Sequence, residues 1–259
     1  MFVIPSVEPV AFYLGNIAIY KYGITLAIAI FVAIFTANSI FNRINNGYKK
    51  DLMLEYAPLI IIIGILCARL YFCVLNPSYY LSHPLEILDI RQGGLSIHGG
   101  LIGGIAAILV AAKISKCPSM LILDSLACAA FLGQAIGRWG NYFNSEAYGL
   151  PVAGQNWGLF IPKICRLEQF YDIKLYHPAF LYESLLDFGG FILLLWLINK
   201  FGKKYIGLVF YSYLMLYSII RLIVEQIRVD SVLNIGNIHI AVIVSLILFR
   251  LHNLALHQF

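Results

Sequence analysis

Residues 53–75, MLEYAPLIIIIGILCARLYFCVL, decide the fold class of this chain. A helix that crosses a bilayer needs about 20 predominantly apolar residues, and this run has that length, with Glu55 and Arg69 as its charged residues. Similar apolar runs lie on both sides of it. They cover residues 18–40, 95–112, 120–138, 179–198, 205–227 and 236–250. We therefore expect an all-α, polytopic integral membrane protein with about seven transmembrane helices.

The composition excludes a water-soluble globular protein. The 259 residues are 61% hydrophobic and 12% charged, whereas a soluble domain has about 25% charged residues. The spans leave no long stretch for a separate aqueous domain, so we expect residues 1–259 to form a single membrane-embedded domain. Residues 1–17 contain no Lys or Arg, so the start lacks the basic region of a cleavable signal, and the first span is expected to remain in the mature protein.

Charge and cysteine content restrict the kinds of partner. The formal net charge of +5 comes from 18 Lys and Arg that are spread over the whole length without a dense run. This pattern makes nucleic acid a poor partner and an anionic lipid bilayer a better one. The 5 cysteines show no CxxC pair, no paired His spacing and an odd total, so we expect neither a zinc site nor a disulfide framework. We also expect no cofactor and no other metal.

Basic residues between the spans predict the orientation in the membrane. If the N-terminus lies outside, the inner segments hold the following basic residues: Arg43, Lys49, Lys50, Lys113, Lys116, Lys200, Lys203, Lys204 and Arg250. The positive-inside rule therefore favours an outer N-terminus and a cytoplasmic C-terminus. The longest loop, residues 139–178, then lies outside, and we expect it to form a small periplasmic cap over the helices.

Polar side chains inside the spans gather at one depth. A charged residue near the centre of a span costs about 2.5 to 3.5 kcal/mol, so such residues are candidates for function. With the predicted helix directions, the candidates lie in the outer part of the membrane. They are Tyr22, Arg69, His98, Arg138, Glu183, Asp187, Arg221 and Glu225. Asp124 lies about 21 Å before Arg138 along its helix, so we place it near the inner end, outside this group.

Structural alternatives remain open for some of these residues. Arg69 and Arg228 are equally compatible with anchors whose side chains reach the headgroups. Arg221 and Glu225 stand four residues apart on one helix face, where an ion pair with a purely structural role is an alternative.

The segment GGLSIHGGLIGG, residues 93–104, places His98 between glycine pairs. Glycines at such spacing usually allow helices to pack closely, in which case His98 is only a structural hydrogen bonder. The small neighbours also leave room for a ligand, and an imidazole with an ordinary pKa of about 6.5 suits proton transfer near neutral pH. His98 is therefore a candidate for a general base.

The segment GRWGNYFNSEAYG, residues 137–149, combines Arg138 and Glu146 with Asn141 and Asn144. We expect it to leave the helix in a turn, because its Gly and Asn residues favour turn conformations. A guanidinium offers forked donors that match the oxygens of a phosphate, so an Arg beside two amides indicates a phosphate-binding site. A polar turn at the membrane interface is the alternative.

These two motifs, followed by HPAFLYES at 177–184 and RLIVEQIRVD at 221–230, resemble those of the bacterial prolipoprotein diacylglyceryl transferases in order and spacing. The resemblance implies transfer of the diacylglyceryl group of phosphatidylglycerol to the thiol of the lipobox cysteine in a prolipoprotein signal peptide. Glycerol phosphate is released, and the reaction is the first step of lipoprotein maturation. The location implied is the bacterial inner membrane, with the active site towards the outer leaflet.

The resemblance also implies which residues take part. By their positions in the motifs, the catalytic residues are His98, Arg138 and Arg221. The substrate-binding residues are Tyr22, Arg138, Asn141, Glu146, Gly149, Arg221 and Glu225.

The chemistry suggests roles for these groups. We expect Arg138 and Arg221 to stabilise the leaving phosphate, with Glu225 orienting Arg221. Glu146 would orient Arg138 or bind glycerol hydroxyls, and Asn141 would donate to the headgroup.

Two other classes of protein compete with the enzyme. A transporter or scramblase also gathers charges inside the membrane, but here the charges lie at one depth and no inverted repeat is visible. A membrane scaffold or receptor would explain the glycine-rich packing but not the buried charges.

Overall fold

The computed structural model describes residues 2–89, 93–229, 234–235 and 238–239. Within these residues it contains six helices that are long and apolar enough to cross a membrane. They are α1 (Lys21–Ile44), α2 (Leu52–Leu75), α4 (Ile97–Ser115), α5 (Ser119–Asn144), α6 (Ala179–Phe201) and α7 (Leu208–Glu225). They confirm the polytopic membrane fold. Of the seventh predicted span, only Ile238 and His239 are described, in the short strand β7, and the rest lies outside the described residues.

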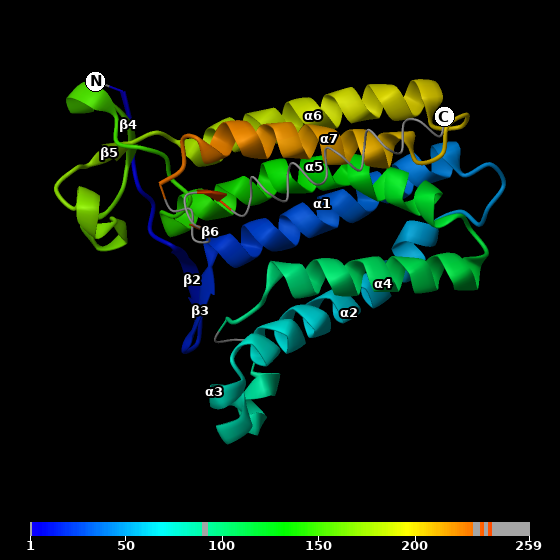
Figure 1. The fold of residues 1–259 in the computed structure, drawn as a ribbon, viewed down its shortest axis with the longest axis horizontal. Coiled ribbons are helices and arrows are strands. Elements are labelled where there is room, and N and C mark those ends of the chain that lie inside the picture. Colours follow the sequence, from blue (N-terminus) through cyan, green and yellow to red (C-terminus); the bar gives the residue numbers. More distant parts are fainter. Residues whose placement is uncertain (1, 90–92, 230–233, 236–237, 240–259) are drawn as a thin grey trace.

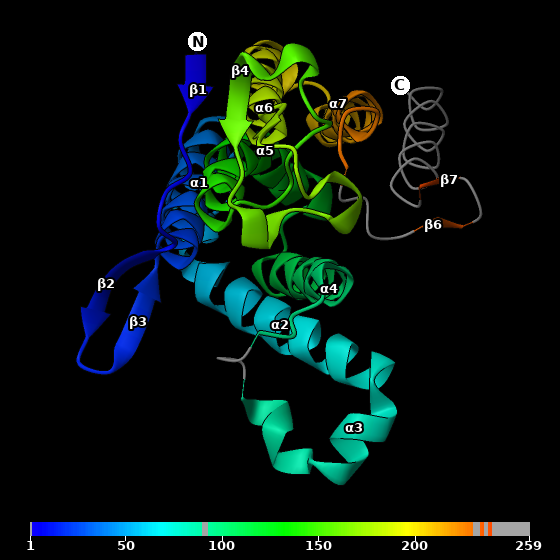
Figure 2. The same cartoon turned by 90° about the vertical axis from the view of Figure 1, so that its left-hand side faces the viewer.

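Successive long helices run in opposite directions (Figure 1). One end of the bundle, which we call the strand end, therefore holds the starts of α1, α4 and α6 and the ends of α2, α5 and α7. The opposite end, the loop end, carries the basic residues predicted for the inner loops, except Arg250, which lies outside the described residues. Seen from the strand end, α2 and α4 form one pair, and α1, α5, α6 and α7 form a second group (Figure 2).

Glycines allow α4 to pack closely on α2. A Cβ atom on Gly103 would lie 2.5 Å from the Cβ of Cys67, and one on Gly99 would collide with the Cys67 carbonyl. Real side chains do not fit at these positions. The close-packing interpretation of the glycine-rich segment is therefore confirmed for Gly99 and Gly103.

Asp124 joins α5 to the start of α7 near the loop end. Its two carboxylate oxygens accept hydrogen bonds from the backbone N–H groups of Gly207, at 2.6 Å, and Phe210, at 2.7 Å. A carboxylate at a helix N-terminus satisfies N–H groups that have no partner within the helix. The prediction that Asp124 lies away from the outer polar group is confirmed, and its structural role is to cap α7.

Short strands and turns of helix complete the fold. A three-stranded sheet, in the order β1-β4-β5, combines β1 (Phe2–Ile4), β4 (Trp157–Phe160) and β5 (Leu175–Tyr176). Two pairs of strands are β2 (Val10–Leu14) with β3 (Ile17–Tyr20) and β6 (Asn234–Ile235) with β7 (Ile238–His239). The short helical elements are α3 (Pro77–Ser82), η1 (Pro84–Leu88), η3 (Ala153–Gln155), η4 (Lys163–Cys165) and η5 (Glu168–Phe170).

The first span starts later than predicted. Residues 17–20, expected to lie at or next to the start of the helix, form β3 and pair with β2 in an antiparallel hairpin. Gly15 in the connecting turn has a φ of 61°, a conformation that glycine adopts without strain. A short apolar run such as Ile17–Tyr20 suits a strand as well as a helix, so its pattern alone did not distinguish them.

The fourth span is longer than predicted, and the turn expected in residues 137–149 begins only after Asn144. Helix α5 continues to Asn144 and ends at Ser145, whose φ is 54°. Tertiary packing overrides the weak helix propensity of Gly and Asn here. At Gly140 the absent side chain leaves room for the ring of Tyr22, which lies 2.8 Å from where a Cβ atom would be. The predicted cap, 139–178, thus begins with residues that belong to α5.

Candidate functional site

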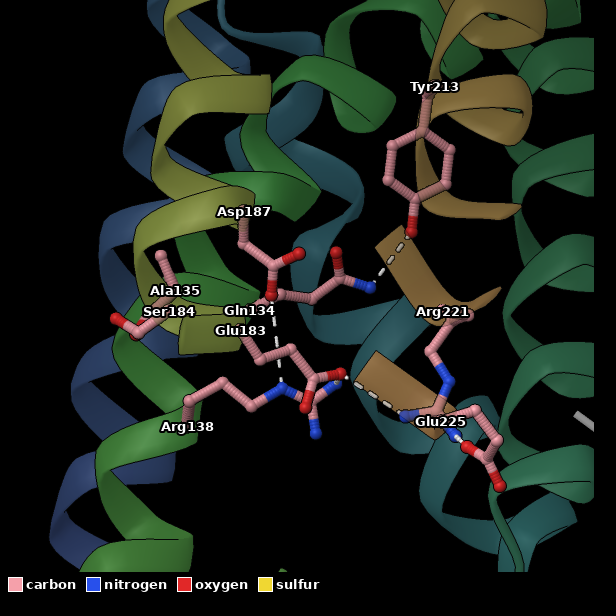
Figure 3. A network of polar contacts seen from close by, with 9 residues as sticks. All are labelled: Gln134, Ala135, Arg138, Glu183, Ser184, Asp187, Tyr213, Arg221 and Glu225. Atoms are coloured by element: carbon pink, nitrogen blue, oxygen red, sulfur yellow. Dashed lines mark hydrogen bonds and ion pairs between the residues drawn. The ribbon is translucent and has the colours of Figure 1, made fainter. Parts of the chain in front are cut away.

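Three helices bring five charged side chains together at the strand end (Figure 3). They are Arg138 from α5, Glu183 and Asp187 from α6, and Arg221 and Glu225 from α7. We call these five residues the arginine cluster. The sequence had placed all five at one depth, and the structure adds that α5, α6 and α7 are neighbours, so the side chains meet.

Glu183 lies at the centre of the arginine cluster. Its Oε1 atom is 2.6 Å from Nη2 of Arg138 and 3.3 Å from Nη1 of Arg221. Only 2% of the Glu183 side chain is exposed. One buried carboxylate oxygen thus contacts guanidinium groups from two different helices.

Glu225 forms the ion pair that its spacing predicts. Its Oε2 atom lies 2.7 Å from Nη2 of Arg221, one turn earlier on the same helix. Hydrogen bonds between two charged groups are shorter and stronger than those between neutral groups. The predicted contact between Arg221 and Glu225 is therefore confirmed, and it limits the orientations open to the Arg221 guanidinium.

Asp187 lies one turn further along α6 than Glu183 and makes a weaker contact. Its Oδ2 atom is 3.8 Å from Nε of Arg138, and neither buried atom has a hydrogen-bond partner among the described residues. Next to this pair, the amide of Gln134 donates to the hydroxyl of Tyr213 at 3.0 Å (Figure 3). Polar groups therefore continue from the arginine cluster towards the middle of the bundle.

Arg138 keeps donors available for a ligand. Its Nη1 atom forms no hydrogen bond or ion pair with any residue that the structure describes, and 21% of the side chain is exposed. Guanidinium groups bind phosphate oxygens through parallel N–H donors, and their effect on a developing negative charge is stronger where water is scarce. The arginine cluster is therefore suited to hold a phosphate ester and to stabilise it as a leaving group.

Asn141 and Glu146 lie next to each other at the end of α5. The amide of Asn141 donates to Oε1 of Glu146 at 3.0 Å, and the amide of Asn144 reaches the same oxygen at 3.4 Å. Glu146 is exposed and makes no ion pair with Arg138 in the described part of the chain, so it does not orient Arg138 directly. Tyr22 packs on the same part of α5, within electrostatic range of Glu146 and Arg138.

Gly149 holds the cap to the bundle. Its N–H donates to the carbonyl of His177 at 2.8 Å, and the next N–H, of Leu150, donates to the carbonyl of Ile227 at 2.8 Å. A Cβ atom on Gly149 would lie 2.8 Å from the Cβ of His177 and 2.9 Å from Cγ2 of Ile227. The buried glycine thus occupies a position where a side chain does not fit, which is a packing role.

His98 lies at the strand end, as predicted, but not within the arginine cluster. It is exposed in the first turn of α4, and its ring lies 6.1 Å from that of Tyr71 on α2. No hydrogen bond or ion pair joins His98 to Arg138 or Arg221 in the residues that the structure describes. The predicted depth of His98 is correct, whereas a direct contact with the arginines is not present.

Arg69 is bound within the protein and does not have the exposed side chain expected of a headgroup anchor. Its side chain is buried and donates to the backbone carbonyls of Glu86 and Ile87 and to those of Gly93 and Gly94, at 2.6 to 3.1 Å. These contacts hold the segment with α3 and η1 against the end of α2. Arg228 forms an isolated backbone bridge with Gly149.

The prediction of site residues left Glu183 without a role, although the sequence contains a signal for it. Glu183 belongs to the HPAFLYES motif and stands four residues before Asp187, which places both carboxylates on one face of α6. Gln134 also stands four residues before Arg138 and shares its face of α5. No group of three His, Cys, Asp or Glu residues suited to a metal ion occurs in the described residues.

Comparisons of the sequence with known proteins show relatives of this chain. A sequence model of a family described as prolipoprotein diacylglyceryl transferase matches residues 9–257. A phosphatidylglycerol–prolipoprotein diacylglyceryl transferase of Staphylococcus saprophyticus is 40% identical over 96% of this chain and 88% of its own length. Proteins with the same name from Bacillus cytotoxicus, 39% identical over 94% of this chain and 88% of theirs, and Bacillus velezensis, 37% over 95% and 89%, are similar.

Proposed function

Because the chain belongs to the prolipoprotein diacylglyceryl transferase family, we propose that the arginine cluster binds the phosphate of phosphatidylglycerol during transfer. The chain is a transferase that acts on phosphatidylglycerol and a prolipoprotein, and its activity is the first step of lipoprotein maturation. The proposal concerns which side chains carry out this activity.

One observation carries the proposal: two arginines from different helices converge on Glu183, and one terminal nitrogen of Arg138 has no partner among the residues that the structure describes. During the reaction the sulfur of a lipobox cysteine forms a bond to a glycerol carbon while the bond from that carbon to the phosphate oxygen breaks. The electron pair stays on the phosphate, so negative charge grows there. Two guanidinium groups placed at this oxygen in advance would lower the barrier without reorganisation.

The remaining site residues are assigned by position. Glu225 orients Arg221 through their ion pair. Asn141, near the end of α5, and the exposed Glu146 just after this helix would bind the polar glycerol of the headgroup. Tyr22 packs beside them on α1, where it lines the lipid groove. These groups hold the lipid, and the nucleophile is supplied by the substrate.

His98 is proposed to take or relay the proton of the incoming thiol. A free thiol has a pKa near 8.5 and its thiolate is the reactive form, so a base increases the reactive fraction. His98 is exposed at the same end of the bundle, and its location on α4 rather than beside the arginines suits a group that serves the peptide rather than the phosphate. The thiol proton leaves through the imidazole as the new carbon–sulfur bond forms.

We propose that the strand end faces the outer leaflet of the bacterial inner membrane, with the N-terminus outside and the C-terminus in the cytoplasm. The basis is the positive-inside rule, since the loop end carries Lys49 and Lys203 among its basic residues. The exposed Cys165 of the cap should react with a membrane-impermeant thiol reagent in intact cells. Cys117 is a poor reporter for the loop end, because burial raises the pKa of its thiol to about 11.

A Lys203→Cys variant in a Cys165→Ser background is the matched reporter for the loop end. We expect it to be labelled only after the membrane is permeabilised, whereas Cys165 is labelled without that treatment. The opposite pattern would reverse the proposed orientation.

Transfer of labelled lipid to a synthetic peptide tests the enzyme directly. Phosphatidylglycerol labelled in its acyl chains is incubated with the purified chain and a lipobox peptide, and a peptide with Ser in place of the lipobox Cys is the control. We expect a thioether-linked lipid on the Cys peptide and none on the Ser peptide. Movement of the lipid between leaflets without a covalent product would instead support the scramblase alternative.

A further inference from the structure

Glu183 contacts both arginines of the cluster through the same atom. Oε1 lies 2.6 Å from Nη2 of Arg138 and 3.3 Å from Nη1 of Arg221. In the part of the chain that the structure describes, the contacts of the other two carboxylates differ. The Glu225 ion pair with Arg221 lies within α7, and Asp187 lies 3.8 Å from Arg138 without a hydrogen bond.

The backbone beside Glu183 is fixed to the neighbouring helix. The hydroxyl of Ser184 donates to the carbonyl of Ala135 on α5 at 2.7 Å, and both residues are buried. Ala135 precedes Arg138 by one turn, so this bond ties α6 to α5 at the level of the cluster (Figure 3). The Glu183 carboxylate therefore projects from a part of α6 that is held in place against α5.

Two guanidinium groups repel each other when they approach in a site with little water. Glu183 supplies the negative charge that allows Arg138 and Arg221 to come close, and it lies on α6, a different helix from either arginine. We propose that Glu183 is a positioning residue that sets the spacing of the two arginines, so that both reach one phosphate. This inference rests on the proposed function, in which the arginines bind that phosphate.

Two substitutions separate the position of the carboxylate from its charge. Glu183→Gln keeps the length of the side chain and an oxygen that accepts hydrogen bonds, but removes the charge. Glu183→Asp keeps the charge and withdraws it by one methylene. If spacing is the function, we expect kcat to fall about 100-fold in both variants, because Glu183→Gln no longer offsets the repulsion between the guanidinium groups and Glu183→Asp no longer reaches both of them. The KM for phosphatidylglycerol should change less than threefold, because both arginines remain to attract the anion.

Asp124→Asn is the matched control, because Asp124 is also a buried carboxylate that joins two helices, but at the loop end. We expect this variant to unfold at a lower temperature while kcat of the folded enzyme stays within threefold of the original. Thermal unfolding of every variant shows whether a loss of activity follows a loss of folded protein.

A double variant that combines Glu183→Asp with Arg221→Lys adds a second measurement. Its fold-decrease in kcat should be smaller than the product of the fold-decreases in the two single variants.

The outcomes are distinct. Wild-type kcat in folded Glu183→Asp would overturn the positioning role, because charge alone would then suffice. Losses that multiply in the double variant would also overturn it, since Glu183 would not act through Arg221. The proposed function fails separately, if the unsubstituted chain transfers no lipid to the peptide or if folded Arg138→Lys retains normal rate and lipid affinity.

Discussion

Two regions at the strand end hold arginine side chains in different ways. Arg69 on α2 donates to four backbone carbonyls of the segment that follows its helix. Arg138 and Arg221, on α5 and α7, are held by the carboxylates of Glu183 and Glu225 instead. Both arrangements place a guanidinium in a bundle that spans a membrane, and both satisfy the need for partners there.

The two regions differ in whether the arginine has N–H donors available for a ligand. The Arg69 donors are used on carbonyl groups, which carry only partial charges and cannot move away without unfolding the segment. A carboxylate side chain rotates more easily, and Arg138 keeps one terminal nitrogen without a partner in the described residues. We therefore infer that Arg138, held by side chains with a donor to spare, is a binding group, whereas Arg69, whose donors go to the backbone, is a structural group.

The largest expected effect in this comparison is that of Arg138→Lys. Lysine keeps the positive charge but loses the forked donors, so we expect kcat/KM to fall by a factor of about 100 to 1,000. The measurement is transfer of labelled phosphatidylglycerol to a lipobox peptide, with thermal unfolding to show that the variant is folded. A folded Arg138→Lys enzyme with normal rate and lipid affinity would contradict the assignment of Arg138 to the phosphate.

His98→Gln tests whether the pair formed by α2 and α4, which carries Arg69 and His98, takes part in the reaction at the arginine cluster. Glutamine keeps hydrogen-bonding groups and cannot take up a proton near neutral pH. We expect turnover to fall about 100-fold, and the remaining rate to lose the dependence on pH that an imidazole confers. If most of the turnover and its pH dependence survive, His98 is a structural or headgroup-binding residue and not the base.

Arg69→Lys tests the structural role of Arg69. One ammonium does not reach the carbonyls of both Glu86 and Gly93 that the guanidinium joins, and buried polar groups left without partners cost about 1 to 3 kcal/mol. We expect a lower unfolding temperature and faster proteolysis of residues 77–88, with transfer by the folded enzyme within about threefold of the original. A loss of transfer as large as that of Arg138→Lys would remove the distinction between the two regions.

The smallest expected effect is that of Asp51→Asn at the loop end, where neutral amides hold a carboxylate. Hydrogen bonds from the amides of Asn38 and Asn42, each 2.8 Å long, lower the pKa of Asp51 from its ordinary value of 3.8. The folded pKa lies below the unfolded one, so this stabilisation is present above about pH 4 and is lost as the pH falls through the folded pKa. Unfolding temperatures at pH 7 and pH 3 should differ slightly less in Asp51→Asn than in the original chain. An unchanged difference would show that Asp51 does not contribute.

Much of the fold followed from the sequence because hydrophobicity and charge report position along the membrane normal. The apolar runs predicted the long helices, and the depths of Arg138, Glu183 and Arg221 predicted that they lie at one end. The depth of a residue in the membrane does not specify which helices are neighbours, however. It did not reveal that Glu183 would lie between the two arginines, or that His98 would lie outside the cluster, because both depend on which helices are neighbours.

Local sequence signals were misleading where tertiary packing decides. Residues 17–20 are apolar enough to extend a span, but pairing with β2 makes them a strand. Gly140 and Asn141 suggested a turn, but the Tyr22 ring fills the space beside Gly140 and the helix continues. The contact of Glu183 with both arginines was missed for the same reason, since it forms across helices and does not follow from the motif that contains Glu183.

The cap that Asp124 places on α7 has a consequence for the response to membranes of different thickness. Asp124 ties α7 to α5 near the loop end, and Arg138 and Arg221 meet through Glu183 about 21 Å away along α5. Two attachments this far apart prevent α7 from sliding along α5. We therefore expect hydrophobic mismatch to be absorbed mainly by tilting α5 and α7 together, which would keep the distance between the two guanidinium groups similar in lipids of different thickness.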